Sequence, residues 1–289
     1  MEVKVRLPYR EPYDAAAILG FLARRAVPGV EVVDADGYRR SLRLPHGPGT
    51  VALQVTGGAV QARFRLTDQR DQEPAQLLAR RLLDLDADPA AIAAVLGADP
   101  LLAPLVARRP GVRVPGHVDG FELAVRAILG QQVTVTGAST LAGRIVARLG
   151  EPLGPLADPA VHRLFPTPAA MAADDLAGIG LTGARITALR ALAAAMADGS
   201  LVLAPGADPE ATRKRLLALP GIGPWTHAYV AMRALADPDQ IPVTDLGIRQ
   251  AMTRLGAESD ARSVARQAER WRPFRSYAAL QLWTSLAPP

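Results

Sequence analysis

The hydrophobic pattern of this chain changes once, near Glu73, and that change limits the possible folds more than any other feature of the sequence. Before it, short runs alternate between apolar and polar residues, as half-buried strands do. These runs cover residues 3–7, 30–34, 38–44, 50–55 and 60–66, with a helical pattern over about 12–26 between the first two. Asp36-Gly37 and Gly57-Gly58 separate neighbouring runs and are typical of hairpin turns. We therefore predict an antiparallel sheet with one or two helices packed on it.

After Glu73 the pattern is helical to the end of the chain, with interruptions at Pro-Gly pairs. The helix that begins near Asp119 is the best defined, because Glu122 follows three residues later and completes a capping box. Two segments are similar to each other, residues 176–180 (LAGIG) and 219–223 (LPGIG), and each lies between two helical patterns. The sequence thus predicts an α+β chain with two helix–hairpin–helix units in its helical part.

Composition excludes several classes of site. The chain has no cysteine, which excludes disulfides, thiolate zinc sites, iron–sulfur clusters and a cysteine nucleophile. Its four histidines show no metal-ligand spacing. Charged residues interrupt every long apolar run and no apolar signal segment is present, so we expect a cytoplasmic protein without membrane contact. The net charge of +5 and the sequence pI of about 10.0 favour a polyanionic partner only weakly.

Residues 178–183 match the dinucleotide-binding fingerprint G-x-G-x-x-G, but their context does not. That fingerprint lies between a buried strand and a helix, whereas the residues before Gly178 have a polar, helical pattern. A nucleotide-dependent oxidoreductase is therefore rejected, because it would need a parallel sheet in this region.

Residues 219–225 (LPGIGPW) have the composition of a tight turn that leads into a helix. Gly221 and Gly223 allow backbone angles that other residues rarely adopt, and Pro224 suits the first turn of a helix. Such a turn directs several backbone N–H groups to one place, where an anion can bind. With DNA as the ligand that anion is a phosphate; the alternative is a connector that only packs two helices.

Aromatic residues make up only 4% of the chain, so their positions are informative. Trp225 and Tyr229 are four residues apart after the turn and share a helix face with Met232. This spacing indicates either core packing or a surface on which a base can stack. Trp283 is a third candidate for stacking, whereas Trp271 is expected in the core.

Asp245 lies just before a helical pattern, in the segment PVTDLGIR at residues 242–249. By itself this position indicates an N-cap. A carboxylate there can also act in catalysis, because cleavage of an N-glycosidic bond builds positive charge on the sugar and a helix N-terminus holds a negative charge in place. The two interpretations are compatible.

Together, LPGIG at 219–223 and the following Val243-Thr244-Asp245 resemble the signature of the helix–hairpin–helix DNA glycosylase superfamily. The wider pattern resembles the AlkA-type 3-methyladenine DNA glycosylases and spans nearly the whole chain. It includes PYD at 12–14, LGFLA at 19–23, PG at 110–111, the stretch 121–131, PTP at 166–168 and ERWRPFRSY at 269–277.

The resemblance implies an N-terminal antiparallel α/β domain of the TBP-like type at 1–88, followed by a two-lobed helical glycosylase region at 89–289. We place the lobe with the hairpin at 116–237 and the second lobe at 89–115 plus 238–289, with the active cleft between them. The resemblance further implies a base excision repair enzyme. It would flip alkylated purines such as 3-methyladenine and 7-methylguanine out of double-stranded DNA and leave an abasic site.

By the same resemblance, Asp245 is the catalytic carboxylate, and the substrate base is bound by Trp225, Tyr229, Trp283 and Phe21. The residues expected to contact DNA are Gln131, Gln132, Gly221, Ile222, Gly223 and Thr226. A Na⁺ or K⁺ ion is expected on the hairpin backbone near Leu219 and Ile222, and no other cofactor is implied.

Relatives that also cut the strand carry a lysine two residues after the last glycine of the hairpin, where this chain has Trp225. An indole has no amine to form a Schiff base, so we expect no strand cleavage. Gln132 stands where AlkA-type enzymes can insert an apolar wedge into the DNA stack. Leu246 follows Asp245 where some relatives have tyrosine, so the preferred lesion of those relatives is not assigned to this chain.

Two other functions stay open. One is a glycosylase for deaminated or oxidised bases, which the missing lysine and the N-terminal domain disfavour. The other is a non-catalytic protein that binds damaged DNA, which would need neither Asp245 nor the aromatic residues. We expect a monomer without an obligate protein partner, because no sustained heptad pattern or large apolar stripe is visible.

Overall fold

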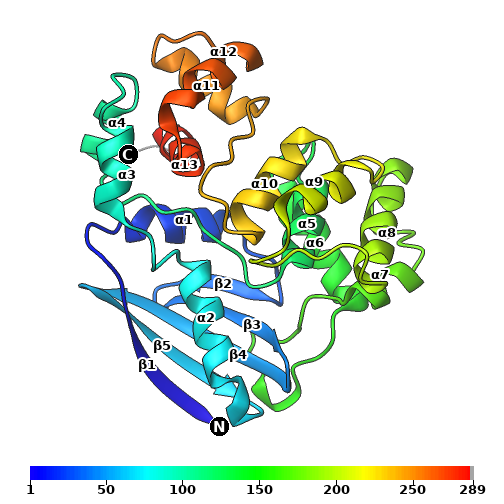
Figure 1. Cartoon of the computed structure of the whole chain (residues 1–289). Coiled ribbons are helices and arrows are strands. Elements are labelled where there is room, and N and C mark those ends of the chain that lie inside the picture. Colours follow the sequence, from blue (N-terminus) through cyan, green and yellow to red (C-terminus); the bar gives the residue numbers. More distant parts are fainter. Residues whose placement is uncertain (287–289) are drawn as a thin grey trace.

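The N-terminal part of the chain is a five-stranded antiparallel sheet, as predicted. A computed structural model gives the structure of residues 1–286 and shows the sheet at the base of the molecule (Figure 1). The strands are β1 (Glu2–Pro8), β2 (Glu31–Asp34), β3 (Gly37–Leu44), β4 (Gly47–Thr56) and β5 (Ala59–Leu66). Their order in the sheet is β1-β5-β4-β3-β2.

The two predicted hairpin turns are present, one of them shifted by a residue. Gly57-Gly58 turns β4 into β5, whereas the turn from β2 to β3 uses residues 35–36 and Gly37 opens the next strand. Gly37 has a φ of +106°, and a Cβ there would lie 2.3 Å from the carbonyl oxygen of Leu53. Only glycine fits this close approach of two backbones.

Two helices accompany the sheet. α1 (Ala15–Arg25) is shorter than the predicted 12–26, because Asp14 caps it by accepting a hydrogen bond from the Ala17 N–H at 2.9 Å. α2 (Gln72–Leu82) lies along the sheet, and its buried residues share an apolar core with the strands (Figure 1). α1 runs between the sheet and the helical part of the molecule, so it can supply side chains to both.

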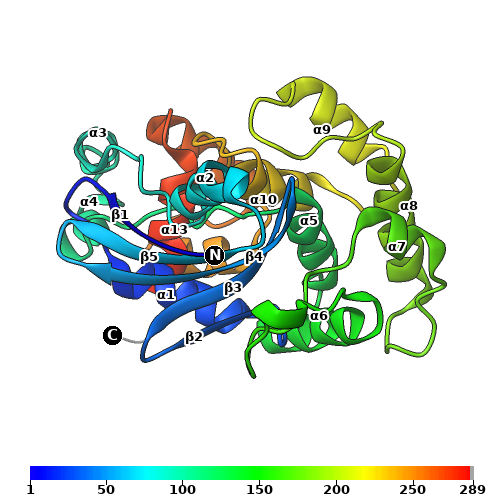
Figure 2. The same cartoon turned by 90° about the horizontal axis from the view of Figure 1, so that it is seen from below.

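The rest of the chain is helical. Its elements are α3 (Pro89–Leu96), α4 (Ala103–Arg108), α5 (Gly120–Leu129), α6 (Val135–Leu149), α7 (Pro168–Ala173), α8 (Gly183–Ala197), α9 (Pro209–Leu217), α10 (Pro224–Ala234), α11 (Leu246–Arg254), α12 (Ala261–Ala268) and α13 (Arg275–Ser285), with 3-10 turns η1 (Gln69–Asp71), η2 (Gly154–Leu156) and η3 (Glu269–Trp271). α5 to α10 lie to one side, and α3, α4 and α11 to α13 lie to the other (Figures 1 and 2).

One core of buried side chains runs through both groups of helices. It also includes Phe21, Val27 and Val30 from the N-terminal part, so the sheet and the helices are packed into one body. Trp271 belongs to this core and is 0% exposed, as predicted. The domain boundary at residue 88 and the division into two lobes stay predictions.

Both helix–hairpin–helix units are confirmed. Residues 176–180 lie between α7 and α8, and residues 219–223 lie between α9 and α10. In the first unit Gly178 and Gly180 have φ values of +77° and +87°, so these glycines serve the turn. Among residues 1–286 no parallel sheet adjoins this segment, which agrees with the rejection of a dinucleotide site.

Only one half of the capping box predicted for α5 is present, the N-cap. Asp119 is the N-cap and accepts hydrogen bonds from the N–H groups of Phe121 (2.8 Å) and Glu122 (3.2 Å). The reciprocal bond is absent, because the Asp119 N–H donates to Nδ1 of His117 instead (3.2 Å). The carboxylate of Glu122 accepts hydrogen bonds from Arg40 and Arg126 instead.

Glu122 joins a group of buried charges that we call the buried ion cluster: Glu31, Arg40, Glu122 and Arg126. Arg40 of β3 donates from Nη2 to Glu122 Oε2 at 2.6 Å, and Arg126 of α5 donates to Glu31 Oε1 at 2.6 Å. Burial opposes the ionisation of Glu31, but Arg126 and Arg40 outweigh it and hold its pKa below the ordinary value. The cluster therefore ties the sheet to α5.

Asp84, just after α2, makes the stability depend on pH. Burial raises its pKa to about 7, although its Oδ2 accepts a hydrogen bond from the Val114 N–H at 3.1 Å. An unfolded aspartate has a pKa of about 3.9, so between these two values Asp84 ionises in the unfolded chain but not in the folded one. Its contribution to the free energy of unfolding therefore falls as the pH rises from about 4 to 7, by at most about 1.4 kcal/mol per unit.

Urea unfolding of the wild type and Asp84→Asn at several pH values measures this contribution. The free energy of unfolding of the wild type minus that of the variant should decrease steadily from about pH 4 to pH 7. A difference that stays constant over this range would show that Asp84 ionises as readily in the folded chain as in the unfolded one.

Candidate active site

Asp245 caps the N-terminus of α11, as its position in the sequence predicts. Its Oδ1 accepts a hydrogen bond from the Ile248 N–H at 2.9 Å, and its own N–H donates to the Pro242 carbonyl at 2.8 Å. The side chain is half-buried. The helix N-terminus therefore fixes the position of the carboxylate and stabilises its negative charge.

Two tryptophans from different helices hold the same carboxylate. Trp225 of α10 donates from Nε1 to Asp245 Oδ2 at 2.8 Å, and Trp283 of α13 donates from Nε1 to Asp245 Oδ1 at 2.8 Å. Gly247 leaves room for this arrangement, because a Cβ there would lie 3.1 Å from both Asp245 Oδ1 and Trp283 Cδ1. Each carboxylate oxygen thus accepts at least one N–H bond, and α10, α11 and α13 meet at Asp245.

Tyr229 stands between the two indoles. Its ring stacks on Trp225 with 5.3 Å between centroids and 8° between planes, and its centroid lies 6.2 Å from that of Trp283. The hydroxyl accepts a hydrogen bond from Nη1 of Arg233 at 2.6 Å. Burial alone would raise the pKa of Tyr229, but Arg233 and Arg25 outweigh it and lower that pKa. Met232, predicted on the same face, is in the core.

Phe21 reaches this group from α1 and lies against two guanidinium groups. The centre of its ring is 3.7 Å from the guanidinium carbon of Arg25 and 4.8 Å from that of Arg233. Arg233 is fully buried and also donates to the carbonyls of Pro115 (2.7 Å) and Gly116 (3.1 Å). Sequence reasoning missed both arginines, although Arg233 follows Tyr229 by four residues on one helix face and could have been found by that spacing.

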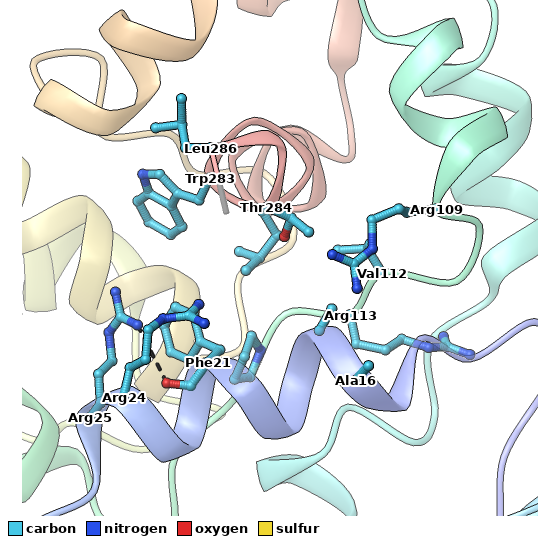
Figure 3. Close-up of a pocket in the computed structure, with 13 residues that line it drawn as sticks. Ala16, Phe21, Arg24, Arg25, Arg109, Val112, Arg113, Trp283, Thr284 and Leu286 are labelled. Atoms are coloured by element: carbon cyan, nitrogen blue, oxygen red, sulfur yellow. Dashed lines mark hydrogen bonds between the residues drawn. The ribbon is translucent and has the colours of Figure 1, made fainter. Parts of the chain in front are cut away.

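The structure therefore brings together all the residues predicted to bind the substrate base. Phe21 and Trp283 also line a cavity of about 520 Å³ between α1 and α13, shown in Figure 3. Leu246, next to Asp245, is 67% exposed.

The hairpin before α10 has the geometry that its glycines predict. Gly221 has a φ of +72°, and Gly223 is the N-cap of α10 without a side-chain cap. The first N–H groups of this helix are therefore open to an anion. Ile222 is buried, so only its backbone can take part in such a contact.

Gln131, at the end of α5, is tied to this hairpin. Its Nε2 donates to the Gly221 carbonyl at 2.9 Å and to the Thr226 hydroxyl at 3.0 Å. Thr226 is 2% exposed and its hydroxyl holds Gln131 in place, so only its backbone can take part in the predicted DNA contact, which stays a prediction. Gln132 is exposed at the tip of the loop and has a φ of +55°.

Side chains offer no metal site in the described part of the chain, where no group of three His, Asp or Glu residues is close enough to hold an ion. The carbonyls of Leu219 and Ile222 are oxygen donors of the kind that Na⁺ and K⁺ accept, and Leu219 O already accepts a bond from the Ile222 N–H at 3.3 Å. A monovalent ion on the hairpin stays a prediction. Among residues 1–286, no helix has the length and apolar character needed to cross a membrane.

Two family models match the chain, one that ends just before α5 and one that begins within it. The AlkA N-terminal domain matches residues 4–119, and the HhH-GPD superfamily base excision DNA repair protein matches residues 125–274. The chain belongs to the HhH-GPD superfamily. In this HhH-GPD protein, the second match contains the hairpin, Trp225, Tyr229 and Asp245, whereas Phe21 and Trp283 of the candidate site lie outside it.

Relatives of this HhH-GPD protein support the assignment. DNA-3-methyladenine glycosylase 2 of Escherichia coli is 38% identical over 282 residues, which cover 96% of this chain and 95% of that protein. The probable bifunctional transcriptional activator/DNA repair enzyme AlkA of Mycobacterium tuberculosis is 47% identical over 287 residues, 99% of this chain. The chain spans only 58% of the length of that second relative.

A solved structure agrees with the fold. The 3-methyladenine DNA-glycosylase from Archaeoglobus fulgidus matches with a TM-score of 0.85 at 23% identity and covers 97% of both chains. The α+β architecture of this HhH-GPD protein, a sheet followed by helix–hairpin–helix units, is thus shared with a known structure over nearly its full length.

Proposed function

We propose that this protein is a monofunctional DNA glycosylase that hydrolyses the N-glycosidic bond of alkylated purines, such as 3-methyladenine and 7-methylguanine, in duplex DNA. The observation that carries the proposal is the carboxylate of Asp245, fixed by a helix N-terminus and two indole N–H groups beside three aromatic rings. We expect it to act as a monomer in the cytoplasm on flipped-out bases.

Asp245 supplies the negative charge that this reaction needs. When the bond between C1′ and the base nitrogen breaks, its electron pair stays with the base and the sugar becomes an oxocarbenium ion. A fixed carboxylate below the sugar stabilises that ion, since it needs no reorganisation when the charge appears. Water then adds to C1′ and loses a proton, which Asp245 can accept. An abasic site and a free base result.

The residues around Asp245 bind the base and a DNA phosphate, and so orient the substrate. Trp225, Tyr229 and Trp283 offer ring faces and edges for a base, and a cationic alkylated purine gains from their electron-rich faces. The open N–H groups at the start of α10 would hold a DNA phosphate. Trp225 replaces the lysine of strand-cutting relatives, so no residue at that position can form a Schiff base.

Release of methylpurines from a methylated duplex tests the proposal. The expected result is free 3-methyladenine and 7-methylguanine, with the strand intact until alkali cleaves the abasic site. Binding to the duplex without release of methylated, deaminated or oxidised bases would instead identify a damage-binding protein. Strand cleavage without alkali would contradict the monofunctional mechanism.

Gln132 is expected to fill the gap that the flipped base leaves. It is exposed at the loop tip, so Gln132→Ala should keep the thermal stability of the wild type yet slow base release by about tenfold, because the gap is left unfilled. Single-turnover release measures this. Gln61→Ala, at an exposed position of β5, is the matched control. Equal rates for the two variants would remove Gln132 from the mechanism.

A further inference from the structure

The cavity beside the candidate site is large enough for more than a methyl group. Its volume of about 520 Å³ lies between α1, α13 and the segment that follows α4. Figure 3 shows Phe21 and the last turn of α1 on one side, Trp283 and Thr284 of α13 on another, and Arg109 opposite Arg24 and Arg25. Because Trp283 also donates to Asp245, the cavity adjoins the proposed reaction centre across this one indole.

All charged side chains that line the cavity are arginines: Arg24, Arg25, Arg109 and Arg113. Asp14 neutralises Arg109, accepting bonds from its Nε (2.8 Å) and Nη2 (3.1 Å). The ion pairs found within residues 1–286 include neither Arg24 nor Arg25. The cavity therefore carries uncompensated positive charge next to a base-binding site.

The unpaired positive charge affects the contacts and the pKa of Arg25. Its guanidinium lies 3.7 Å from the centre of the Phe21 ring, and Nη1 has a long bond of 3.4 Å to the Phe21 carbonyl. Burial lowers the pKa of Arg25; Tyr229 opposes this effect, and the neighbouring Arg24 lowers the pKa further. An anion in the cavity would offset the effects of burial and of Arg24, because it favours the charged guanidinium. A carboxylate suits this site, since its two oxygens match the forked donors of a guanidinium.

The anion has two possible sources on DNA, the backbone and the base. A backbone phosphate carries a sugar on each side and stays in the strand. A short arm on the flipped base enters together with that base, and the base is the part of DNA that meets Phe21 and Trp283 in the proposed function. Phe21 is 4% exposed, so the arm of a base reaches this depth more readily than a phosphodiester.

We propose that this cavity accepts a carboxylate carried on a short alkyl arm of the excised base, so that carboxymethylated purines are among the substrates. The inference rests on the proposed function and extends it from methyl groups to anionic substituents. Arg24 and Arg25 would bind the carboxylate, while Asp245 acts on the sugar as it does for a methylated base.

Three duplexes test this inference. They are identical except for one guanine, which carries at N7 a methyl, a carboxymethyl or a carbamoylmethyl group. The carbamoylmethyl arm has nearly the size of the carboxymethyl arm but no charge. Single-turnover release of each base is divided by its spontaneous loss from the same duplex, which removes differences in leaving-group ability. The wild type should favour carboxymethyl over carbamoylmethyl by about tenfold, as a charge-assisted hydrogen bond would give.

Arg24→Gln should lower this preference at least about threefold and leave the release of 7-methylguanine unchanged, because Arg24 is exposed and does not hold Asp245. Arg108→Gln is the matched control, an exposed arginine of α4 outside the cavity, and it should keep the preference. Equal normalised rates for the two arms in the wild type would overturn the inference. So would an Arg24→Gln variant that slows all three duplexes alike, because the cations would then serve the DNA backbone. If 7-methylguanine is not released either, the proposed function fails and this inference fails with it.

Discussion

Asp245→Asn is expected to release 7-methylguanine from a duplex at about a thousandth of the wild-type rate, because the fixed negative charge that stabilises the oxocarbenium ion is lost. Binding to the duplex should be kept, since the hairpin and Gln132 are untouched. Single-turnover release and a gel-shift titration on the same duplex measure the two properties separately. A variant that releases the base at nearly the wild-type rate would remove Asp245 from catalysis.

This variant also changes the hydrogen bonds of the site, so it needs a control for folding. Both carboxylate oxygens accept indole N–H bonds, but an asparagine has one oxygen and one NH₂ group, which cannot accept. One indole N–H therefore loses its partner, at a cost of about 1–3 kcal/mol. Asp260→Asn is the matched control. Asp260 also caps a helix through its side chain, but it lies at α12, and asparagine is an equally good cap.

Glu122→Gln is expected to lower the free energy of unfolding by about 3–5 kcal/mol, the largest change in stability that we predict. Glu122 is 1% exposed and accepts bonds from Arg40 (2.6 Å) and Arg126 (2.9 Å). Without its charge, two buried guanidinium groups share Glu31 as their remaining carboxylate in the buried ion cluster. Urea unfolding followed by circular dichroism measures the loss.

An exposed ion pair provides the comparison for Glu122. Glu210 and Arg213 pair at 3.0 Å on the surface of α9, where water and salt screen the interaction. Glu210→Gln should therefore change the free energy of unfolding by less than about 1 kcal/mol. If Glu122→Gln had an equally small effect, the sheet would be held to α5 by apolar packing rather than by the buried charges.

Features set by neighbouring residues could be predicted from the sequence. The strands, the turn at Gly57-Gly58 and the N-caps at Asp119 and Asp245 follow from alternation, turn glycines and capping chemistry, which act over a few residues. The two helix–hairpin–helix units were visible as a short repeat. Trp271 was assigned to the core because nothing placed it beside a turn or a candidate site.

Features that join distant segments could not be predicted this way. Nothing near Glu122 in the sequence indicates that it pairs with Arg40 of the sheet, so the capping box was the simpler hypothesis. The resemblance named Thr226 among the DNA contacts, and only the packing of α5 against α10 shows that its hydroxyl faces Gln131. The indole bonds to Asp245 likewise depend on how α10, α11 and α13 meet. The resemblance to a family placed these residues in one site but did not give their contacts.

The tryptophans of this chain have one more consequence. Two of its three indoles, Trp225 and Trp283, donate their N–H groups to Asp245, and the third, Trp271, is sealed in the core. Indole emission responds to local polarity, to hydrogen bonding and to stacked rings. Trp271 supplies a constant background, so changes in the intrinsic fluorescence report on Asp245 and its surroundings. If the proposed function holds, the arrival and departure of a base can therefore be followed by stopped-flow emission, without a dye on either the protein or the DNA.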